Sequence, residues 1–308
     1  MRINTSLEFF GIEYKKNLEH LNYIIVANTY NRPLELVLRN LRASLNQKIP
    51  PQKIILIDQN IGGLNLPEDV LTNHLLIKTS TNKKSVSAAR NTLVIPQGAE
   101  WIFFCDDDGY PCEDYSEKLE KIISKNPSLD ILAGSIVRED NKEFYSLRHS
   151  KGGSLKSFRN TKNLMGSNFV IKAKVFDELG RFDENFGAGS MWGSSEETDF
   201  CWKAYFAGKN MEFFPELIVY HVPPFNESFK YGFHKSFKYG VGKGALVSKW
   251  LFKNKEIKVI YELLEMITVP FIQSIRGLFT FKFGLIAANF AALTGRLYGM
   301  IKYVFTAK

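Results

Sequence analysis

The 308-residue sequence has few of the features that mark secreted, zinc-binding or membrane-spanning proteins. Its three cysteines, at positions 105, 112 and 201, are too few and too scattered for a disulfide framework, and none belongs to a CxxC pair. The first twenty residues carry charges throughout and include no apolar core, so we expect no secretory signal. These absences favour a reducing compartment.

Glycine-rich phosphate loops are also missing. No segment fits GxxxxGK[ST] or GxGxxG, which disfavours P-loop and dinucleotide-binding proteins, and there is no GxSxG nucleophile motif. Any phosphate groups must therefore be held by a metal ion and by basic side chains.

Long apolar runs are absent as well. The cleanest one, 283–293, is far shorter than the roughly 20 residues that span a bilayer. It lies in an aromatic-rich tail interrupted by Arg276, Lys282, Arg296 and Lys302, and this tail follows a block, 225–258, with eight lysines and two glutamates. We expect helices that lie on an acidic membrane surface, while packing as ordinary core or as a dimer surface stays open. Nucleic acid is disfavoured, because the aromatic residues of the basic block serve a membrane equally well.

Short apolar runs alternate with helical stretches between residues 21 and 221, which predicts an α/β fold with a mainly parallel sheet flanked by helices. The expected strands are 23–27, 53–57, 75–78, 101–105, 130–137, 168–171 and 218–221. The expected helices are 86–94, 115–125, 197–207 and one that starts at Pro33, with an apolar face of leucines at 34, 38, 41 and 45. Two prolines at 223 and 224 mark a boundary between a domain, 1–225, and a C-terminal helical amphipathic region, 226–308.

Three adjacent carboxylates, Asp106, Asp107 and Asp108, follow the strand 101–105. Ligands of open α/β sheets bind at the carboxyl ends of strands, and mutually repelling carboxylates require a counterion such as Mg²⁺ or Mn²⁺. Alternate residues point the same way, so Asp106 and Asp108 can face one ligand while Asp107 turns aside. A solvated acidic turn is the structural alternative.

A second acidic segment, 196–199, opens a helix. Acidic residues at a helix N-terminus are favoured by the helix dipole whatever the function, but one of them can also take a proton from an attacking hydroxyl. His221 ends a strand, and Trp192 lies among glycines just before the acidic segment. A structural histidine and a half-buried loop tryptophan are the alternatives to a metal ligand and a sugar-stacking ring.

In this order, the segments resemble family 2 glycosyltransferases of the GT-A fold. The resemblance covers 23–224, about two thirds of the chain. The matching segments are the strand 23–27 with the turn 28–33, Asp58, the motif 87–91, the motif 103–108, the motif 196–200 and the closing pair 220–221.

The resemblance implies a role for each matched position. Asn28, Tyr30 and Arg32 would cradle the nucleotide base, with Asp58 accepting a hydrogen bond from a pyrimidine N–H. Arg90 would lie near the nucleotide and its phosphates, and Asp106 and Asp107 would also belong to the donor site, Asp106 at the ribose or at the water shell of the metal.

The remaining implied roles concern the metal and the reaction. Asp108 would bind a divalent metal, Mn²⁺ or Mg²⁺, and His221 would complete that site. Glu197 would be the general base, with Glu196 as the alternative, and Trp192 and Asp199 would contact the acceptor.

Two positions depart from the family pattern. Many members have Glu-Asp where this chain has Glu196-Glu197, which lengthens the side chain of the base by one methylene. Many also have an acidic residue where Gln59 follows Asp58, which leaves base selectivity open.

The function implied by the resemblance is inverting transfer of a sugar from a nucleoside-diphosphate sugar, UDP or dTDP favoured, to a hydroxyl of a glycan or lipid-linked saccharide. The expected setting is bacterial cell-surface polysaccharide synthesis, on the cytoplasmic, inner face of the plasma membrane. Two alternatives remain. A sugar-1-phosphate nucleotidyltransferase needs a glycine-rich loop after its first strand, and 28–32 contains no glycine. A non-catalytic nucleotide- or sugar-binding module would keep Asp58 and Asp108 without a working base.

Overall fold

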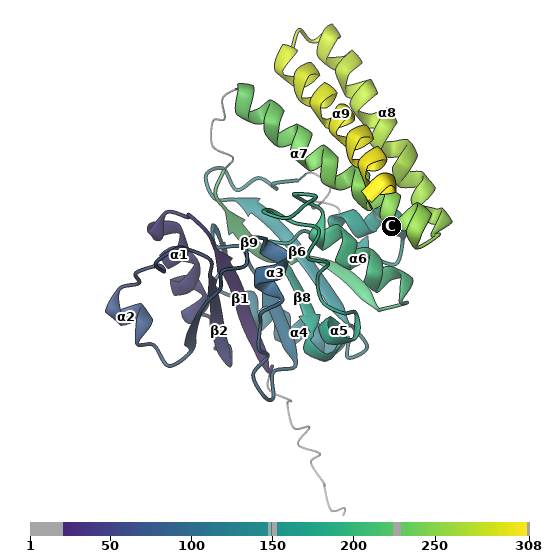
Figure 1. The fold of residues 1–308 in the computed structure, drawn as a ribbon. Coiled ribbons are helices and arrows are strands. Elements are labelled where there is room, and N and C mark those ends of the chain that lie inside the picture. Colours follow the sequence, from purple (N-terminus) through teal and green to yellow (C-terminus); the bar gives the residue numbers. More distant parts are fainter. Residues whose placement is uncertain (1–20, 147–148, 150–152, 224–228, 307–308) are drawn as a thin grey trace, which may run out of the picture.

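The computed structural model describes residues 21–146, 149, 153–223 and 229–306. Its centre is one nine-stranded sheet with the order β3-β2-β1-β4-β8-β6-β9-β5, and β7 pairs with β9 beside this path (Figure 1). The strands are β1 (Tyr23–Thr29), β2 (Lys53–Asp58), β3 (Leu76–Ser80), β4 (Trp101–Phe104), β5 (Gly109–Pro111), β6 (Ile131–Arg138), β7 (Gly153–Ser154), β8 (Phe169–Lys172) and β9 (Met211–His221).

Strand directions change across the sheet. Strands β3, β2, β1 and β4 are parallel to one another, whereas β8 runs antiparallel to both β4 and β6. Strand β9 is parallel to β6 and antiparallel to β5. The predicted α/β sheet is confirmed, but the predicted last strand, 218–221, is only the end of β9. The β6–β9 pairing shifts register between Gly134 and Ser135, next to Pro215 of β9. Because proline has no N–H to donate and is rare inside strands, the sequence pattern of β9 did not indicate its first half.

Helices cover both faces of the sheet. On one face lie α1 (Leu34–Leu45) and α4 (Tyr115–Lys125), and on the other lie α3 (Val86–Arg90), α5 (Ala173–Glu178) and α6 (Glu196–Phe206). Successive residues of β1 and β4 alternate between the two apolar clusters, as the two-residue period of a strand requires. A short helix, α2 (Glu68–Leu71), and a 3₁₀ helix, η2 (Phe158–Asn163), lie in the connections.

The predicted leucine face of α1 is confirmed in part, because Leu41 is buried and Leu38 and Leu45 pack against the same apolar cluster. The fully buried face has other members as well. It consists of Val37, Asn40, Leu41 and Ser44, whereas Leu34 is exposed. The amide of Asn40 donates to the carbonyl oxygens of Asp106 at 3.0 Å and Gly109 at 2.8 Å. The polar side chain of Asn40 thus lies at the centre of this helix face, where it holds the turn that carries the acidic triplet.

The C-terminal region is helical, as predicted, and packs at one corner of the sheet (Figure 1). It consists of α7 (Phe229–Ser248), a π-helical turn η3 (Lys249–Lys253), a 3₁₀ turn η4 (Ile257–Val259), α8 (Ile260–Phe279) and α9 (Phe283–Thr306). Glycines bring α7 and α9 close together: a Cβ added at Gly244 would lie 1.9 Å from the carbonyl oxygen of Arg296.

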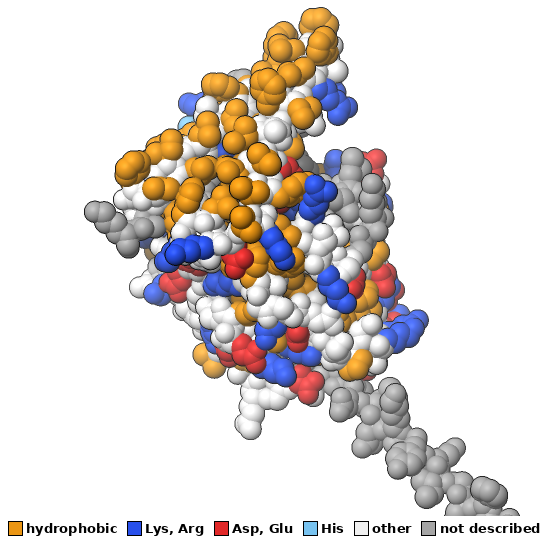
Figure 2. Space-filling view, turned by 90° about the vertical axis from the view of Figure 1, so that its right-hand side faces the viewer, with side chains coloured by type: hydrophobic (Ala, Val, Ile, Leu, Met, Phe, Trp, Pro, Cys, Tyr) orange, Lys and Arg blue, Asp and Glu red, His pale blue; other side chains and the backbone are white. Residues whose placement is uncertain are grey.

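A third apolar cluster joins this region to the rest of the protein. Phe186, Trp192 and Trp202 pack there with Trp250 and Tyr303. Figure 2 shows that apolar side chains also gather on the outer surface of the helical group. Among the described helices, none combines the length and the apolar character that crossing a bilayer requires.

Candidate active site

Polar side chains meet at the carboxyl edge of the parallel strands. The register pairs Thr29 of β1 with Asp58 of β2 and Val26 with Phe104 of β4, so the turns that follow these three strands lie side by side. The end of β9 reaches the same place through β5, because Gly109 is paired with His221. The predicted site residues 28–32, 58, 106–108 and 221 are thus brought together at one edge, where ligands of α/β sheets bind.

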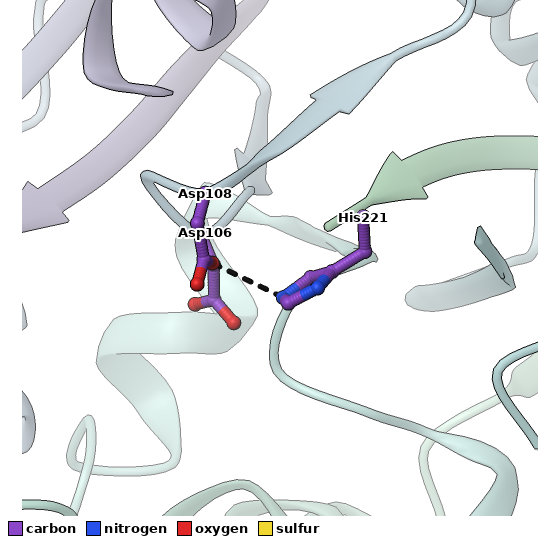
Figure 3. Close-up of side chains that lie close together, drawn as sticks. All are labelled: Asp106, Asp108 and His221. Carbon is purple, nitrogen blue, oxygen red and sulfur yellow. Dashed lines mark ion pairs between the residues drawn. The ribbon is translucent and has the colours of Figure 1, made fainter. Parts of the chain in front are cut away.

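Asp106, Asp108 and His221 form a candidate metal centre (Figure 3). One potential ligand atom from each residue lies within 4.8 Å of the others. Two carboxylates and an imidazole suit Mn²⁺ or Mg²⁺. Asp108 and His221 were predicted as ligands, and the structure adds Asp106 to them, which fits its predicted place near the metal.

His221 is oriented to present one ring nitrogen to this cluster. Its Nδ1 lies 2.9 Å from the carbonyl oxygen of Val222, while its Nε2 lies 3.1 Å from Asp108. Burial lowers the pKa of His221, but the hydrogen bond and charge of Asp108 outweigh burial and raise it to about 9. When Nε2 is protonated, the charged imidazole is the counterion of Asp108. When Nε2 is deprotonated, Nδ1–H still donates to the carbonyl oxygen of Val222, and the lone pair of Nε2 is available to a metal.

Arg32 is the second counterion of the triplet. Its guanidinium contacts Asp107 at 3.0 Å and Asp108 at 2.8 Å. Burial raises the pKa of Asp107 to about 6 although Arg32 opposes the shift. The cluster of potential metal ligands does not include Asp107, which holds Arg32 instead. Because β4 ends at Phe104 and the triplet lies in the following turn, the strand alternation expected for these residues does not set their orientation.

Arg90 links the metal cluster to the second acidic segment. Its side chain is 2% exposed and donates to Asp106 at 2.9 Å and to Asn28 at 3.1 Å. Its remaining Nη1 has no hydrogen-bond partner in the described part of the chain and lies 4.0 Å from Glu197. A buried guanidinium nitrogen without a hydrogen bond is costly, and at 4.0 Å Glu197 offers this nitrogen charge but no hydrogen bond.

Glu196 and Glu197 begin α6 beside Arg90. Glu196 is buried, and the side chain of Glu197 is 24% exposed. Burial and the charge of Glu196 raise the pKa of Glu197 well above its usual range, while Arg90 acts in the opposite direction. Two glycines leave room for the carboxylates: an added Cβ would lie 1.9 Å from Glu197 at Gly166 and 3.1 Å from Glu196 at Gly187.

Asp58 shapes the neighbouring loop. It is fully buried, and its two oxygens accept hydrogen bonds from both nitrogens of Asn60, from the backbone of Leu64 and from Lys78 at 3.1 Å. The predicted direct hydrogen bond to a pyrimidine is therefore not available in this arrangement. Gln59 donates to the carbonyl oxygen of Lys83 and contacts Asn28, which ties the ends of β1 and β2 together.

Tyr30 remains a candidate for base contact. Its ring is 57% exposed at the end of β1, next to the loop that Asp58 holds. An exposed ring there is free to stack on a nucleobase.

Trp192 and Asp199 are not at the surface of the site, so the predicted acceptor contacts do not fit this structure. Trp192 is 3% exposed and packs between Phe186 and Tyr303. Asp199 is completely buried and accepts from Lys249 at 2.7 Å and from the indole of Trp250 at 2.8 Å. Both residues fasten the C-terminal region to α6, a role that no local sequence pattern indicated.

The curled mixed sheet with an acidic cluster at its carboxyl edge defines the GT-A fold. The model of glycosyl transferase family 2 matches residues 24–180, half of the chain, and the chain belongs to this family.

The same fold is found in a crystal structure of GalNAc-T7 with UDP, GalNAc and Mn²⁺, with a TM-score of 0.54 and 14% sequence identity. The similarity covers 77% of this chain and 49% of that one, so the present chain corresponds to about half of its length. At this identity the likeness shows the fold alone. No curated protein matches the chain.

The structure also identifies site residues that the sequence did not. Asn40 holds the acidic turn and Gly166 makes room for Glu197, although the two are distant in the chain from the groups they serve. A buried asparagine in a helix and a lone glycine in a loop carry no local signal of such roles.

Proposed function

We propose that the protein transfers a sugar from a nucleoside-diphosphate sugar to an acceptor hydroxyl with inversion at the anomeric carbon. The observation that carries this proposal is the continuous set of contacts from the Asp106–Asp108–His221 cluster through Arg90 to Glu197. One end of this set suits a metal-bound diphosphate and the other suits a general base. Family membership and the UDP and Mn²⁺ of the GalNAc-T7 structure support a UDP-type donor.

The donor would lie across the ends of β1 and β4. Tyr30 would stack on the base, while Asn28 and Asp106 keep Arg90 aimed at the phosphates or the transferred sugar. Arg32, which is only partly buried, would reach the diphosphate from the other side of the acidic triplet. A divalent cation bound by Asp106, Asp108 and His221 would supply Lewis-acid neutralisation of the leaving diphosphate.

Glu197 would act as the base. The acceptor oxygen forms a bond to the anomeric carbon, the bond from that carbon to the diphosphate breaks with its electron pair leaving on the nucleotide, and the acceptor proton passes to Glu197. Burial and the charge of Glu196 raise the pKa of Glu197, which increases its affinity for the acceptor proton. Glu196 is more deeply buried and would serve mainly to raise the proton affinity of Glu197.

Binding measurements test this proposal and separate it from a non-transferase. Calorimetry with UDP, dTDP, GDP and CMP, each with and without Mn²⁺, should show metal-dependent binding of one diphosphate. Asp108→Ala should abolish it, whereas Asp69→Ala, at an exposed position on α2, should not. Binding of no nucleotide under any condition would refute the proposal. Nucleotide binding without any turnover of the sugar conjugate would favour the non-catalytic module.

We further propose that the protein works at the cytoplasmic face of the plasma membrane on a lipid-linked or glycan acceptor in cell-surface polysaccharide synthesis. Helices α8 and α9 and the turn between them expose many large apolar side chains, including Phe279 at 82% and Phe281 at 80%. Large exposed apolar patches mark interaction surfaces, and Arg276 and Lys282 near these residues suit acidic lipids.

Vesicle flotation tests the membrane proposal. The protein should float with phosphatidylglycerol vesicles more than with phosphatidylcholine vesicles, and Phe279→Ser/Phe281→Ser should reduce flotation. Val94→Ser, at an exposed position of the sheet domain, is the control. Equal flotation of all variants would exclude these helices as the membrane contact.

A further inference from the structure

Helix α7 passes directly over the start of α6. A Cβ added at Gly242 would lie 2.1 Å from Ser194 Oγ and 2.9 Å from the carbonyl oxygen of Trp192. Ser194 Oγ also lies 3.4 Å from the carbonyl oxygen of Tyr239, to which it donates. Since Ser194 is only three positions from Glu197, α7 extends the site on the side of the base.

The two faces of α7 have different neighbours. One face packs on α9, where added Cβ atoms at Gly240 and Gly244 would collide with backbone atoms of Ala292 and Arg296. The opposite face is that of Gly242. At helical spacing of three, four, seven and eleven positions before Gly242, this face carries Tyr239, Lys238, Lys235 and Tyr231, called the α7 stripe below.

The α7 stripe is accessible and leads away from the site. Tyr239 is 58% and Tyr231 is 55% exposed. With a rise of 1.5 Å per residue, Tyr239 lies about 4.5 Å, Lys235 about 10 Å and Tyr231 about 16 Å along the helix from Gly242. In Figure 1 this direction runs from the sheet edge beside α6 outward along the helical group.

The electrostatics agree with this placement. Partial burial and the charges of Glu197, Glu196 and Asp106 raise the pKa of Tyr239, and Lys235 opposes them. The phenol therefore lies within electrostatic reach both of the carboxylates of the site and of the first lysine of the stripe.

We propose that the α7 stripe is the acceptor subsite and that it binds a saccharide carrying a phosphate or diphosphate ester. This inference rests on the proposed transferase function. The ring of Tyr239 supports the acceptor sugar beside Glu197, because aromatic faces pack well against the apolar face of a sugar. Lys235 and Lys238 bind the phosphate through charge-assisted hydrogen bonds, and Tyr231 contacts what lies beyond it.

Two sources share this chemistry, a soluble sugar 1-phosphate and a lipid-linked sugar diphosphate. Both carry a phosphate on the anomeric oxygen of the sugar whose hydroxyl reacts. The outward direction of the stripe accommodates either a short polar group or a longer chain.

The test is calorimetry on the full chain saturated with Mn²⁺ and UDP. The probes are glucose, galactose and N-acetylglucosamine, each as the 1-phosphate and as the methyl glycoside. At least one 1-phosphate should bind more tightly than its methyl glycoside. Lys235→Gln and Lys238→Gln should each weaken its binding about tenfold and reduce the phosphate preference. Tyr239→Ala should weaken both forms, and Tyr239→Phe should restore them.

Matched controls are Tyr298→Ala, a half-exposed tyrosine on α9, and Lys253→Gln, an exposed lysine in η3 beyond the other end of α7. Both should bind as the unchanged protein does. A prenyl diphosphate-linked N-acetylglucosamine distinguishes the sources: tighter binding than the 1-phosphate indicates a lipid-linked acceptor, and weaker binding indicates a soluble one.

Three outcomes overturn the inference. The first is normal binding of the sugar phosphates by the stripe variants, and the second is no binding of any sugar phosphate to the UDP-loaded protein. The third is a lower affinity of the lysine variants for UDP itself, which would assign these lysines to the donor site. Failure of the proposed function is a different result, since it is the absence of UDP binding to the unchanged protein.

Discussion

Gly166→Ala should separate catalysis from donor binding. The added Cβ would lie 1.9 Å from Glu197 Oε1 and 2.6 Å from its Cγ and Cδ, distances that non-bonded atoms do not adopt. Because the contacted atoms form the flexible end of a side chain, the carboxylate should rotate away while the backbone stays in place. The perturbation is therefore confined to the proposed base.

The expected magnitude follows from what a general base contributes. Such a base accelerates a reaction about 10²–10⁴-fold, or about 2.7–5.4 kcal/mol at 1.36 kcal/mol per tenfold. Turnover by Gly166→Ala should fall within this range. The affinity for UDP with Mn²⁺ should stay within about twofold, since the three atoms nearest the added Cβ all belong to Glu197 and none to Asp106, Asp108 or His221.

The assay is release of UDP from the UDP-sugar that the protein binds, together with a thermal melt. Glu197→Gln and the double variant Gly166→Ala/Glu197→Gln should have the same turnover rate. Both substitutions remove the function of the same base, so their effects should not add. Gly284→Ala, where the added Cβ meets nothing within 4 Å, is the control. Normal turnover by Gly166→Ala, or a further loss in the double variant, would refute Glu197 as the base.

Three further predictions concern the metal and the fold. Because Mn²⁺ must displace the proton of His221, Mn²⁺ affinity should rise about tenfold per pH unit up to about pH 9, and a flat profile by calorimetry would contradict the shared site. Lys249→Met removes the nearer of the two cations of the buried Asp199, which leaves only Lys203 at 3.9 Å, and should lower the free energy of unfolding by about 3–5 kcal/mol; an unchanged urea midpoint would disprove the pairing. Asn40→Ala removes two hydrogen bonds to the acidic turn, at the carbonyl oxygens of Asp106 and Gly109, and should weaken Mn²⁺ binding and cost about 1–3 kcal/mol of stability. Normal values of both would show that the backbone bond from Gly109 to Asp106 suffices to hold the turn.

The sequence determined the α/β sheet, most of its strands and the acidic edge. Apolar runs such as 101–105 are buried on both faces, so their composition alone identifies them, and Asp106 follows at the carboxyl end by chain continuity. The roles of Asp108 and His221 could be predicted because the ordered motifs resemble a family.

Only the tertiary structure decided what the remaining residues do. Asp58, Trp192 and Asp199 looked like ligand contacts, yet each is buried, because segments distant in the chain supply their partners. The neighbours of Gly166 and of the α7 stripe depend in the same way on how α6 and α7 pack. Local sequence patterns indicate which side chains are buried. The hydrogen-bond partner of a buried polar group is set by packing between distant segments, and a local sequence pattern does not show which segments these are.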